Sequence, residues 1–272
     1  MRDRVLGEMF GLDGQVAVVT GALGRLGREY VRTLAGAGAR VGAIDVAGDR
    51  SVFGSLADVH VEIADLSKKD ETDRAIGEIV RALGAPSILV NNAGMGSSPA
   101  AAGNENGPFE DYSEAAWDTM IDSHLKTTLF ATQAFIRHFR AAKLAAGSII
   151  NVSSTYGLVT PDQAIYDYKR AGGETFFKPV GYSVAKSGTL NFTRWLAEYG
   201  APFGIRANTL VPGGVREAGH AAEFVKEYEK RTPLGRMAAE SDYNGAILFL
   251  ASRASAYMTG ATLVVDGGWT AR

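Results

Sequence analysis

Seven short apolar runs alternate with helix-length segments along the whole chain. Most runs are apolar at every position, as strands are in a parallel sheet that is covered on both faces. The segments between them carry apolar residues three or four apart, which is the pattern of amphipathic helices. This order predicts a doubly wound α/β sheet with right-handed crossovers and helices on both faces. The expected strands cover residues 15–20, 40–45, 59–64, 87–91, 147–152, 204–210 and 261–266.

Composition and charge exclude several classes of function. The 272 residues are 46% hydrophobic and 21% charged, which allows one large core, and we expect a single domain over residues 1–272. A net charge of −2 gives no electrostatic reason to expect nucleic acid or an anionic membrane as the partner. Cysteine is absent, so thiolate catalysis and cysteine-ligated metals are excluded, and we expect no metal site. Without a signal-peptide core or a run of about 18 apolar residues, we expect a cytoplasmic protein.

A glycine-rich turn follows the first expected strand, with Gly21, Gly24 and Gly27 leading directly into a helix pattern. Glycines let backbone amides approach a pyrophosphate, and a helix N-terminus favours negative charge. Asp45 ends the second expected strand, where an acid can hold both hydroxyls of an adenosine ribose. The alternatives are a packing turn for the glycines and a turn residue for Asp45. Together, the two features favour a Rossmann-type dinucleotide site.

Other unusual segments also follow strands. The fourth expected strand ends in Asn-Asn-Ala-Gly at residues 91–94, where amide side chains can bond neighbouring strands and the small pair lets a flat ring pass close by. On its own this tetrapeptide is a turn signal. Unpatterned segments lie at residues 96–112, 155–181 and 212–219. Because ligands of open α/β sheets bind beyond the carboxyl ends of the strands, we expect these segments to surround a site.

Ser154, Tyr182 and Lys186 form the strongest candidate catalytic group. Tyr182 and Lys186 are four residues apart at the head of a helix pattern, so they project from one face, and Ser154 follows the fifth expected strand. A phenol has an ordinary pKa near ~10, which is too high for acid–base catalysis at neutral pH. A cation ~4 Å away supplies ~4 kcal/mol at an effective dielectric of ~20, enough to lower that pKa by ~3 units. Lys186 is the candidate cation.

These motifs resemble those of single-domain short-chain dehydrogenases/reductases over residues 12–269. The resemblance covers the glycine turn, NNAG, INVSS, YSVAK, NTLVPGG and the tail from TPLGRM to VVDGGW. It implies a nicotinamide dinucleotide cofactor, a contact from Asp65 to an adenine flanked by residues 92–94, and a substrate oxygen polarised by Ser154. It also implies a homo-tetramer in which the last strand and its helix form one interface. The implied cofactor-binding residues are Gly21, Gly24, Arg25, Leu26, Gly27, Asp45, Asp65, Leu66, Asn92, Ala93, Gly94, Tyr182, Lys186, Pro212, Gly213 and Val215.

The sequence departs from the family pattern at three places. The usual turn is TGxxxGxG, whereas here a glycine stands one place earlier, at Gly24, and Arg25 occupies the usual position. His124 stands where the family has an active-site asparagine, so it is a candidate for the proton relay, with a helix-packing role as the alternative. Glu217 lies near the position of a threonine that often follows the proline–glycine pair.

A long insert separates Ser154 from Tyr182. This insert and its flanks most resemble members found with flagellin-glycan and nonulosonic sugar pathways. We expect residues 155–181 to form a polar wall over a substrate with several hydroxyls or an anionic group. The polar residues that this segment offers are Asp162, Gln163, Asp167, Lys169, Arg170, Glu174 and Lys178. The alternatives are an apolar lid, with Ile165, Phe176, Phe177 and Val180 turned inward and the charges outward, and a segment that packs against another subunit.

The sequence therefore predicts an oxidoreductase that interconverts an alcohol and a carbonyl on a sugar-like or polyol substrate. A 3-oxoacyl thioester or steroid reductase of the same mechanism is the alternative, and a dinucleotide sensor without turnover is a third reading. We expect NAD(H) to be preferred, because Asp45 would repel the 2′-phosphate of NADP(H). Arg25 is the argument for NADP(H), since it could offset part of that repulsion.

Overall fold

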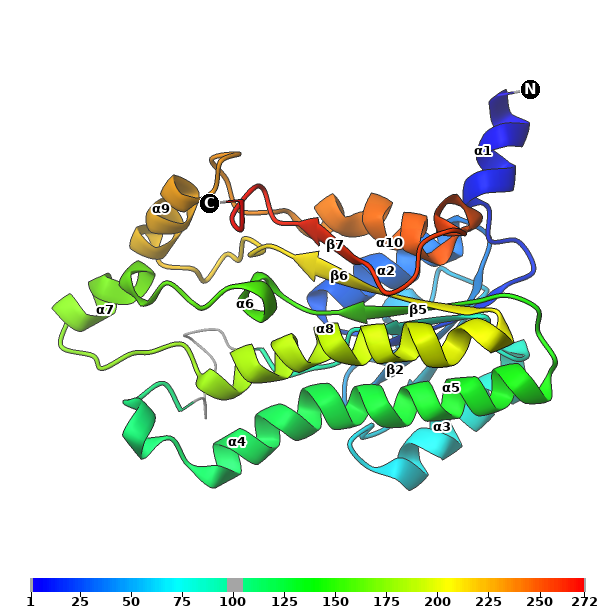
Figure 1. The fold of residues 1–272 in the computed structure, drawn as a ribbon, viewed down its shortest axis with the longest axis horizontal. Helices are drawn as coiled ribbons and strands as arrows, with labels where there is room; N and C mark the ends of the chain where they lie inside the picture. Colours follow the sequence, from blue (N-terminus) through cyan, green and yellow to red (C-terminus); the bar gives the residue numbers. More distant parts are fainter. Residues whose placement is uncertain (1, 97–104, 272) are drawn as a thin grey trace.

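The computed structural model describes residues 2–96 and 105–271. Its centre is a sheet of seven parallel strands in the order β3-β2-β1-β4-β5-β6-β7, which confirms the predicted doubly wound α/β fold (Figure 1). Each strand lies within two residues of the expected bounds. The strands are β1 (Val16–Thr20), β2 (Arg40–Asp45), β3 (Val59–Ile63), β4 (Ile88–Asn91), β5 (Gly147–Val152), β6 (Ile205–Pro212) and β7 (Thr262–Val265).

Helices cover both faces of the sheet. On one face α2 and α10 pack together, and α3, α5 and α8 cover the other (Figure 1). The helices are α1 (Arg2–Phe10), α2 (Arg25–Gly36), α3 (Lys69–Leu83), α4 (Glu114–Ile121), α5 (Thr127–Ala141), α6 (Thr155–Leu158), α7 (Asp167–Ala171), α8 (Val180–Gly200), α9 (Ala222–Arg231) and α10 (Asn244–Ala251). Short 3-10 turns are η1 (Arg50–Phe53), η2 (Phe109–Asp111), η4 (Gln163–Tyr166), η5 (Ala201–Phe203), η6 (Glu240–Tyr243) and η7 (Arg253–Ser255), and η3 (Asp122–Lys126) is a π-helical turn.

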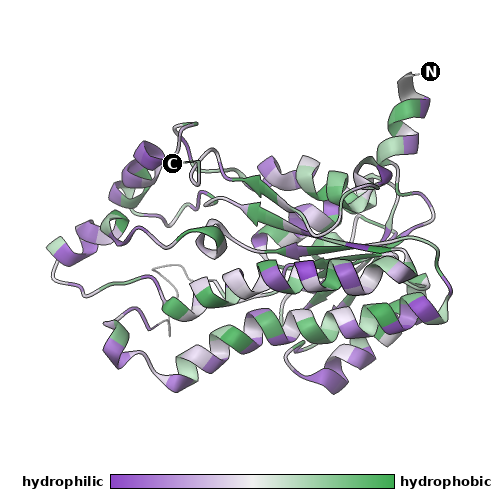
Figure 2. Cartoon of the chain, in the orientation of Figure 1, coloured by the Kyte–Doolittle hydropathy of each residue, from purple (hydrophilic) through white to green (hydrophobic). Residues whose placement is uncertain are grey.

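The strands are apolar throughout because each face of the sheet contributes to a different core. In β1, Ala17 and Val19 face α2 and α10, whereas Val18 faces α3 and α5, and all three are fully buried. Figure 2 shows the apolar strands at the centre and hydrophilic residues on the outer sides of the helices. Burial on both faces is what the uninterrupted apolar runs predicted.

The insert between β5 and α8 folds back beside α9, beyond the carboxyl ends of the strands (Figure 1). Ile165, Tyr166 and Phe176 are buried in an aromatic cluster with Phe224 of α9 and with Trp269 near the C-terminus. The centres of the Tyr166 and Phe176 rings are 4.6 Å apart. This cluster fixes the path of a segment that has little regular secondary structure.

Hydrogen bonds between buried side chains connect the ends of neighbouring strands. Asn91 of β4 donates to Asn151 of β5 at 2.8 Å, and Asn151 donates to Thr193 of α8 at 2.8 Å. Thr209 of β6 donates to the same Thr193 oxygen at 2.8 Å. Asn151 and Thr193 are fully buried, so these bonds are made where water cannot replace them.

Replacing Asn151 with alanine should lower the free energy of unfolding by about 2–4 kcal/mol, because it leaves a buried donor and a buried acceptor without their partner. Urea denaturation measures this loss as a lower midpoint with an unchanged slope. Asn191→Ala is the matched control, since Asn191 is exposed on α8, and we expect a change within about 0.5 kcal/mol. Equal stability of the two variants would contradict the role of the buried bonds.

Candidate active site

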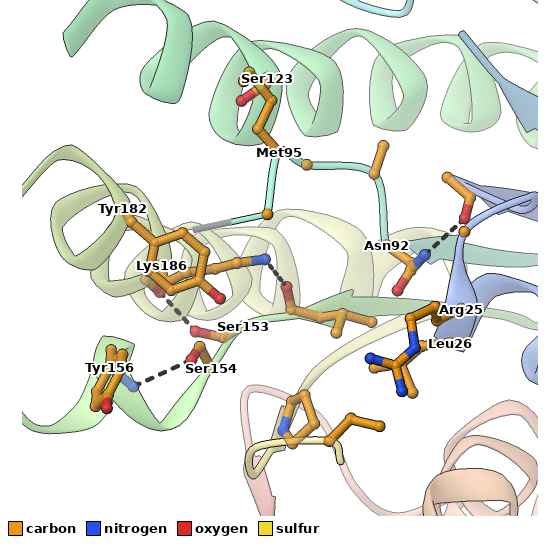
Figure 3. Close-up of a pocket in the computed structure, with 18 of the residues that line it drawn as sticks. Arg25, Leu26, Asn92, Met95, Ser123, Ser153, Ser154, Tyr156, Tyr182 and Lys186 are labelled. Atoms are coloured by element: carbon orange, nitrogen blue, oxygen red, sulfur yellow. Dashed lines mark hydrogen bonds between the residues drawn. The ribbon is translucent and has the colours of Figure 1, made fainter. Parts of the chain in front are cut away.

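A cavity of about 1010 Å³ opens at the carboxyl edge of the sheet. Apart from Gly27 and His124, every predicted site residue lines it. Its volume lies at the upper end of the range for small-molecule sites, about 300–1,000 Å³, so a dinucleotide and a substrate can share it. Figure 3 shows Arg25 and Asn92 at one side and Tyr182, Lys186 and Ser154 at the other.

The glycine turn has the geometry of a cradle for phosphate. Gly21 has a φ of +61°, and a Cβ atom there would lie 2.8 Å from the Cα of Ala93. A Cβ atom at Gly27 would lie 2.0 Å from the carbonyl oxygen of Gly21, so Gly27 lets α2 pack against the turn rather than lining the cavity. Gly24 caps α2 without a side-chain bond, so the first amides of the helix point toward the cavity edge. The turn therefore fits the pyrophosphate of a dinucleotide.

Two carboxylates, those of Asp45 and Asp65, line the cavity that the glycine turn borders. Asp45 accepts bonds from the backbone amides of Leu23 and Val46, both at 2.8 Å, which fixes its carboxylate beside the glycine turn. Asp65 accepts bonds from the side chain and the amide of Ser67, which lower the pKa of Asp65. Both acids face the space in which an adenosine would lie next to the turn.

Arg25 pairs with acidic side chains from two other segments. It contacts Glu217 in the loop after β6 and Glu240 of η6, the latter at 2.7 Å, and it also donates to the backbone oxygen of Arg216 at 2.6 Å. The guanidinium thus joins the glycine turn to the loop that follows β6. Sequence reasoning placed Arg25 in the turn, but it gave no sign of these partners because they are 191 to 215 residues away.

The NNAG segment connects β4 with the glycine turn. The Asn92 side chain donates to the carbonyl oxygens of Thr20 and Gly21 at 3.1 and 3.0 Å, and the amides of Asn92 and Ala93 donate to the Thr20 hydroxyl. Gly94 packs against His124, since a Cβ atom at Gly94 would lie 2.1 Å from the His124 ring. The side-chain amides of Asn91 and Asn92 thus bond to the neighbouring strands β5 and β1, as the sequence predicted.

Tyr182, Lys186 and Ser154 come together at the end of β5 (Figure 3). The Lys186 ammonium lies 5.9 Å from the centre of the Tyr182 ring and donates to the carbonyl oxygen of Val152 at 2.9 Å. Burial lowers the pKa of Lys186 to about 8, so its positive charge persists at pH 7 and is lost as the pH rises above that value. The Ser154 oxygen accepts a bond from the amide of Tyr156 at 3.2 Å and borders the cavity.

His124 lies behind the catalytic group on the π-helical turn η3. Its ring is 3% exposed and meets the Tyr182 ring edge-on, with 5.4 Å between their centres. Nε2 lies 3.1 Å from the carbonyl oxygen of Met95, and Nδ1 is buried with no hydrogen-bond partner among the described residues. Burial, together with the charge of Lys186, holds the pKa of His124 well below its usual value. The ring is therefore neutral and donates from Nε2.

The prediction of a polar wall is wrong for most of the insert. Apart from Lys178, its charged side chains do not line the cavity, because they form ion pairs outside it. Asp162 pairs with Arg231 of α9 at 2.6 Å, and Lys169 pairs with Glu174 at 2.7 Å. Ile165 and Phe176 do turn inward, but they are buried in the aromatic cluster rather than lining the cavity, and Phe177 is exposed. The predicted polar residues that do not line the cavity are Asp162, Gln163, Asp167, Lys169, Arg170 and Glu174.

Sequence reasoning missed much of the substrate side of the cavity. Phe224 and Tyr228 project into it from α9, and His220 precedes that helix. The helical spacing of Phe224 and Tyr228 indicates a buried face, but not what that face covers. The insert contributes Tyr156, Tyr166 and Lys178 to the same space, and of these Lys178 was expected in the polar wall.

A doubly wound sheet whose carboxyl edge combines a glycine turn with a tyrosine–lysine pair defines an oxidoreductase of the dinucleotide-binding class. A family model described as enoyl-(acyl carrier protein) reductase matches residues 21–270. The chain belongs to the short-chain dehydrogenase/reductase family, and it is an NAD(P)-dependent oxidoreductase. The resemblance seen in the sequence is thereby confirmed for the family, but not for the sugar-pathway members within it.

Curated relatives span nearly the whole chain. It is 34% identical to cis-4-hydroxycyclohexanecarboxylate dehydrogenase of Sinomonas cyclohexanicum, over 98% of this chain and 100% of that protein. It is 32% identical to 2-dehydro-3-deoxy-D-gluconate 5-dehydrogenase of Escherichia coli, over 97% and 98% of the two chains. It is also 32% identical to acetoacetyl-CoA reductase of an Acinetobacter species, over 93% and 97%.

Solved structures share the fold over a similar length. A short-chain dehydrogenase of Leptospira borgpetersenii with bound NAD+ has a TM-score of 0.84 and 30% identity, covering 97% of this chain and 95% of that one. A gluconate 5-dehydrogenase of Burkholderia cenocepacia in complex with NADP and tartrate has a TM-score of 0.81 and 28% identity, covering 98% and 99%. These neighbours support a nicotinamide dinucleotide as the cofactor.

No helix within residues 2–96 and 105–271 is both long enough and apolar enough to span a membrane.

His124 should remain neutral as the pH falls from 8 to about 6, because its lowered pKa keeps the proton off Nδ1 over that range. Nitrogen-15 NMR of the histidine rings distinguishes the Nε2–H form from the cation. The ring resonances of His124 are assigned as those that disappear from the spectrum of the His124→Asn variant. If the His124 nitrogens titrate together with an ordinary midpoint near ~6.5, the neutral assignment is wrong.

Proposed function

We propose that Tyr182 is the general acid–base group of this oxidoreductase, with Lys186 and Ser154 beside it. The observation that carries the proposal is that all three line one cavity with the glycine turn and Asp45. The bound nicotinamide supplies the hydride donor or acceptor. In reduction, the Tyr182 hydroxyl gives its proton to the substrate oxygen, and in oxidation the phenolate takes it back. Lys186 stabilises the phenolate by its charge, and the Ser154 hydroxyl donates a hydrogen bond to the same substrate oxygen.

Within this proposal His124 acts as a positioning residue. Its Nε2–H bond to Met95 fixes the segment after Gly94, and its ring packs against the edge of Tyr182. Nδ1 keeps an acceptor lone pair in the wall behind the catalytic group, as a proton relay in place of the usual asparagine requires. A π-helical turn is a common way to aim one side chain out of helical register at a functional site, which supports this role.

We further propose a polar, hydroxylated substrate such as a polyol or a sugar acid. The Escherichia coli relative and the Burkholderia neighbour are both named for sugar acids, and the Sinomonas relative for a hydroxylated carboxylate. Sugars of the nonulosonic type belong to the same chemical class. The acetoacetyl-CoA reductase keeps an acyl thioester as the second candidate, and the aromatic side chains of Phe224 and Tyr228 in the cavity favour it.

The proposed cofactor preference is NAD(H) over NADP(H). Asp45 is fixed beside the turn by two backbone amides, where its charge opposes a 2′-phosphate. Arg25 was the counter-argument, and its pairing with Glu217 and Glu240 means that binding a 2′-phosphate would compete with two carboxylates. Both contacts support the same preference.

We also propose that residues 1–272 form one domain of a cytoplasmic homo-tetramer. The edge position of β7 and the exposed side chain of Val264 on it support an interface there. Light scattering of the purified chain tests the assembly, and the mass of a single 28.8 kDa chain would contradict it.

Tyr182→Phe should lower kcat by about 10²-fold or more while cofactor affinity stays nearly unchanged, because acid–base help is typically worth 10² to 10⁴. Absorbance of the reduced nicotinamide measures turnover on the best substrate from a panel of alcohols and carbonyls. Tyr168→Phe is the matched control, since it removes a phenol oxygen of the insert that does not line the cavity. A Tyr182→Phe enzyme with most of its activity would show that another group supplies the proton.

Asp45→Ser should raise kcat/KM with NADP(H) by about tenfold or more and lower it with NAD(H), since about 1.4 kcal/mol of removed repulsion is a factor of ten. Asp49→Ser removes a nearby exposed carboxylate that caps η1, and serine can keep that cap, so the ratio of the two cofactors should not change. A wild-type enzyme that uses NADP(H) as well as NAD(H) would overturn the proposed preference.

A further inference from the structure

A third cationic side chain lies in the cavity besides Arg25 and Lys186. Lys178, just before α8, lines the same space as the catalytic group. Its ammonium lies 5.5 Å from the centre of the Tyr182 ring and 5.8 Å from the centre of the Tyr156 ring. It is therefore as close to the ring of Tyr182 as Lys186 is, but it comes from the insert rather than from the YSVAK helix.

The other two cations have contacts on the cofactor side. Arg25 pairs with Glu217 and Glu240, and Lys186 donates to the carbonyl oxygen of Val152 at the end of β5. Lys178 belongs to the opposite side, where the insert and α9 enclose the space beyond Tyr182. Lys178 is thus a cation of the cavity that the redox chemistry proposed for Tyr182 does not use.

Lys178 lies in surroundings that are costly for an ammonium. Burial lowers the pKa of Lys178 to about 7, although the charge of Glu217 acts in the opposite direction. The aromatic rings of Tyr156 and Tyr182 lie near the ammonium, and the face of an aromatic ring attracts a cation. An anion that enters this space forms a charge-assisted hydrogen bond with the ammonium, and such bonds are strongest away from water.

We propose that Lys178 binds an anionic group of the substrate, a carboxylate or a phosphate, and so orients the reacting carbon toward Tyr182. The inference rests on the proposed function of Tyr182 and adds the substrate class to it. Because the Lys178 ammonium lies only 5.5 Å from the centre of the Tyr182 ring, the anionic group and the reacting carbon belong to one compact molecule. The other charged residues of the insert pair outside the cavity, so selectivity for the anion depends on this one side chain of the insert.

The test compares matched pairs of charged and neutral compounds. Aldonic acids are paired with the corresponding alditols, hydroxycyclohexanecarboxylate with its methyl ester, and sugar phosphates with free sugars. Steady-state kinetics are measured for the wild type, Lys178→Met and Lys178→Arg. Lys169→Met is the control, because it makes the same substitution in the insert at a lysine that pairs with Glu174 outside the cavity. Binding of D-gluconate, D-glucitol and inorganic phosphate to the NAD+-loaded enzyme is measured by calorimetry in parallel.

Lys178→Met should lower kcat/KM for the charged member of a pair by about 10²-fold, mainly through KM, and change the neutral member by less than about threefold. Lys178→Arg should retain part of the preference, and Lys169→Met all of it. A preference for carboxylates or for phosphates identifies the anion. Equal losses of kcat/KM for charged and neutral substrates would mean that Lys178 affects only the acid–base chemistry of Tyr182, which overturns the inference. A wild-type enzyme that prefers the neutral member of each pair would overturn it as well.

The pH dependence supplies a second readout. The groups that face Lys178 are Tyr156, Tyr182, His220 and Glu217, so the comparison with Lys178→Arg isolates the lysine. Lys178 loses its charge above pH 7, and Lys186 loses its own only above about pH 8. Between pH 7 and 8, KM for a charged substrate should therefore rise by up to about tenfold in the wild type and stay flat in Lys178→Arg.

Failure of the inference differs from failure of the proposed function. If NAD+ binds and neutral alcohols are oxidised with loss of activity in Tyr182→Phe, the function holds and only the role of Lys178 is wrong. If no member of any pair is oxidised or reduced and D-gluconate and phosphate bind Lys178→Met as well as the wild type, both are wrong.

Discussion

All seven strands run in the same direction, so their carboxyl ends meet at a single edge, and every functional side chain depends on that arrangement. Backbone pairing alone does not fix the side chains at this edge. The hydrogen bonds from Asn91 to Asn151 and from Asn151 to Thr193 fix β4, β5 and α8 relative to one another. Helix α8 carries Tyr182 and Lys186. The relative position of phenol, ammonium and glycine turn is therefore set by buried polar contacts that take no part in the reaction.

Much of this fold could be predicted because its signals are local. The bounds of β2 and β5 follow from apolar runs, and the positions of Gly21 and Gly27 follow from close backbone approaches that admit no Cβ atom. The proximity of Tyr182 and Lys186 was also predictable, since their four-residue spacing needs only a helix. These features do not depend on the path of the chain elsewhere.

The insert and the partners of Arg25 could not be predicted, because they depend on segments far apart in the sequence. Charges in the insert, such as Asp162, have ion partners outside the cavity, and nothing in their order along the chain tells which side of the segment faces inward. The aromatic contact of Tyr166 with Phe224 joins residues whose proximity only the folded chain determines. The π-helical turn that carries His124 likewise lacks a sequence pattern of its own.

The ionic contact between Arg25 and Glu217 joins the two loops that border the dinucleotide side of the cavity. Both side chains are about two-fifths exposed, at 38% and 41%, so dissolved ions screen their attraction. Separation of the loops therefore becomes easier as ionic strength increases, whereas the buried bonds below them are unaffected. The ionic contact between the loops and the buried polar contacts that position Tyr182 and Lys186 thus respond differently to salt.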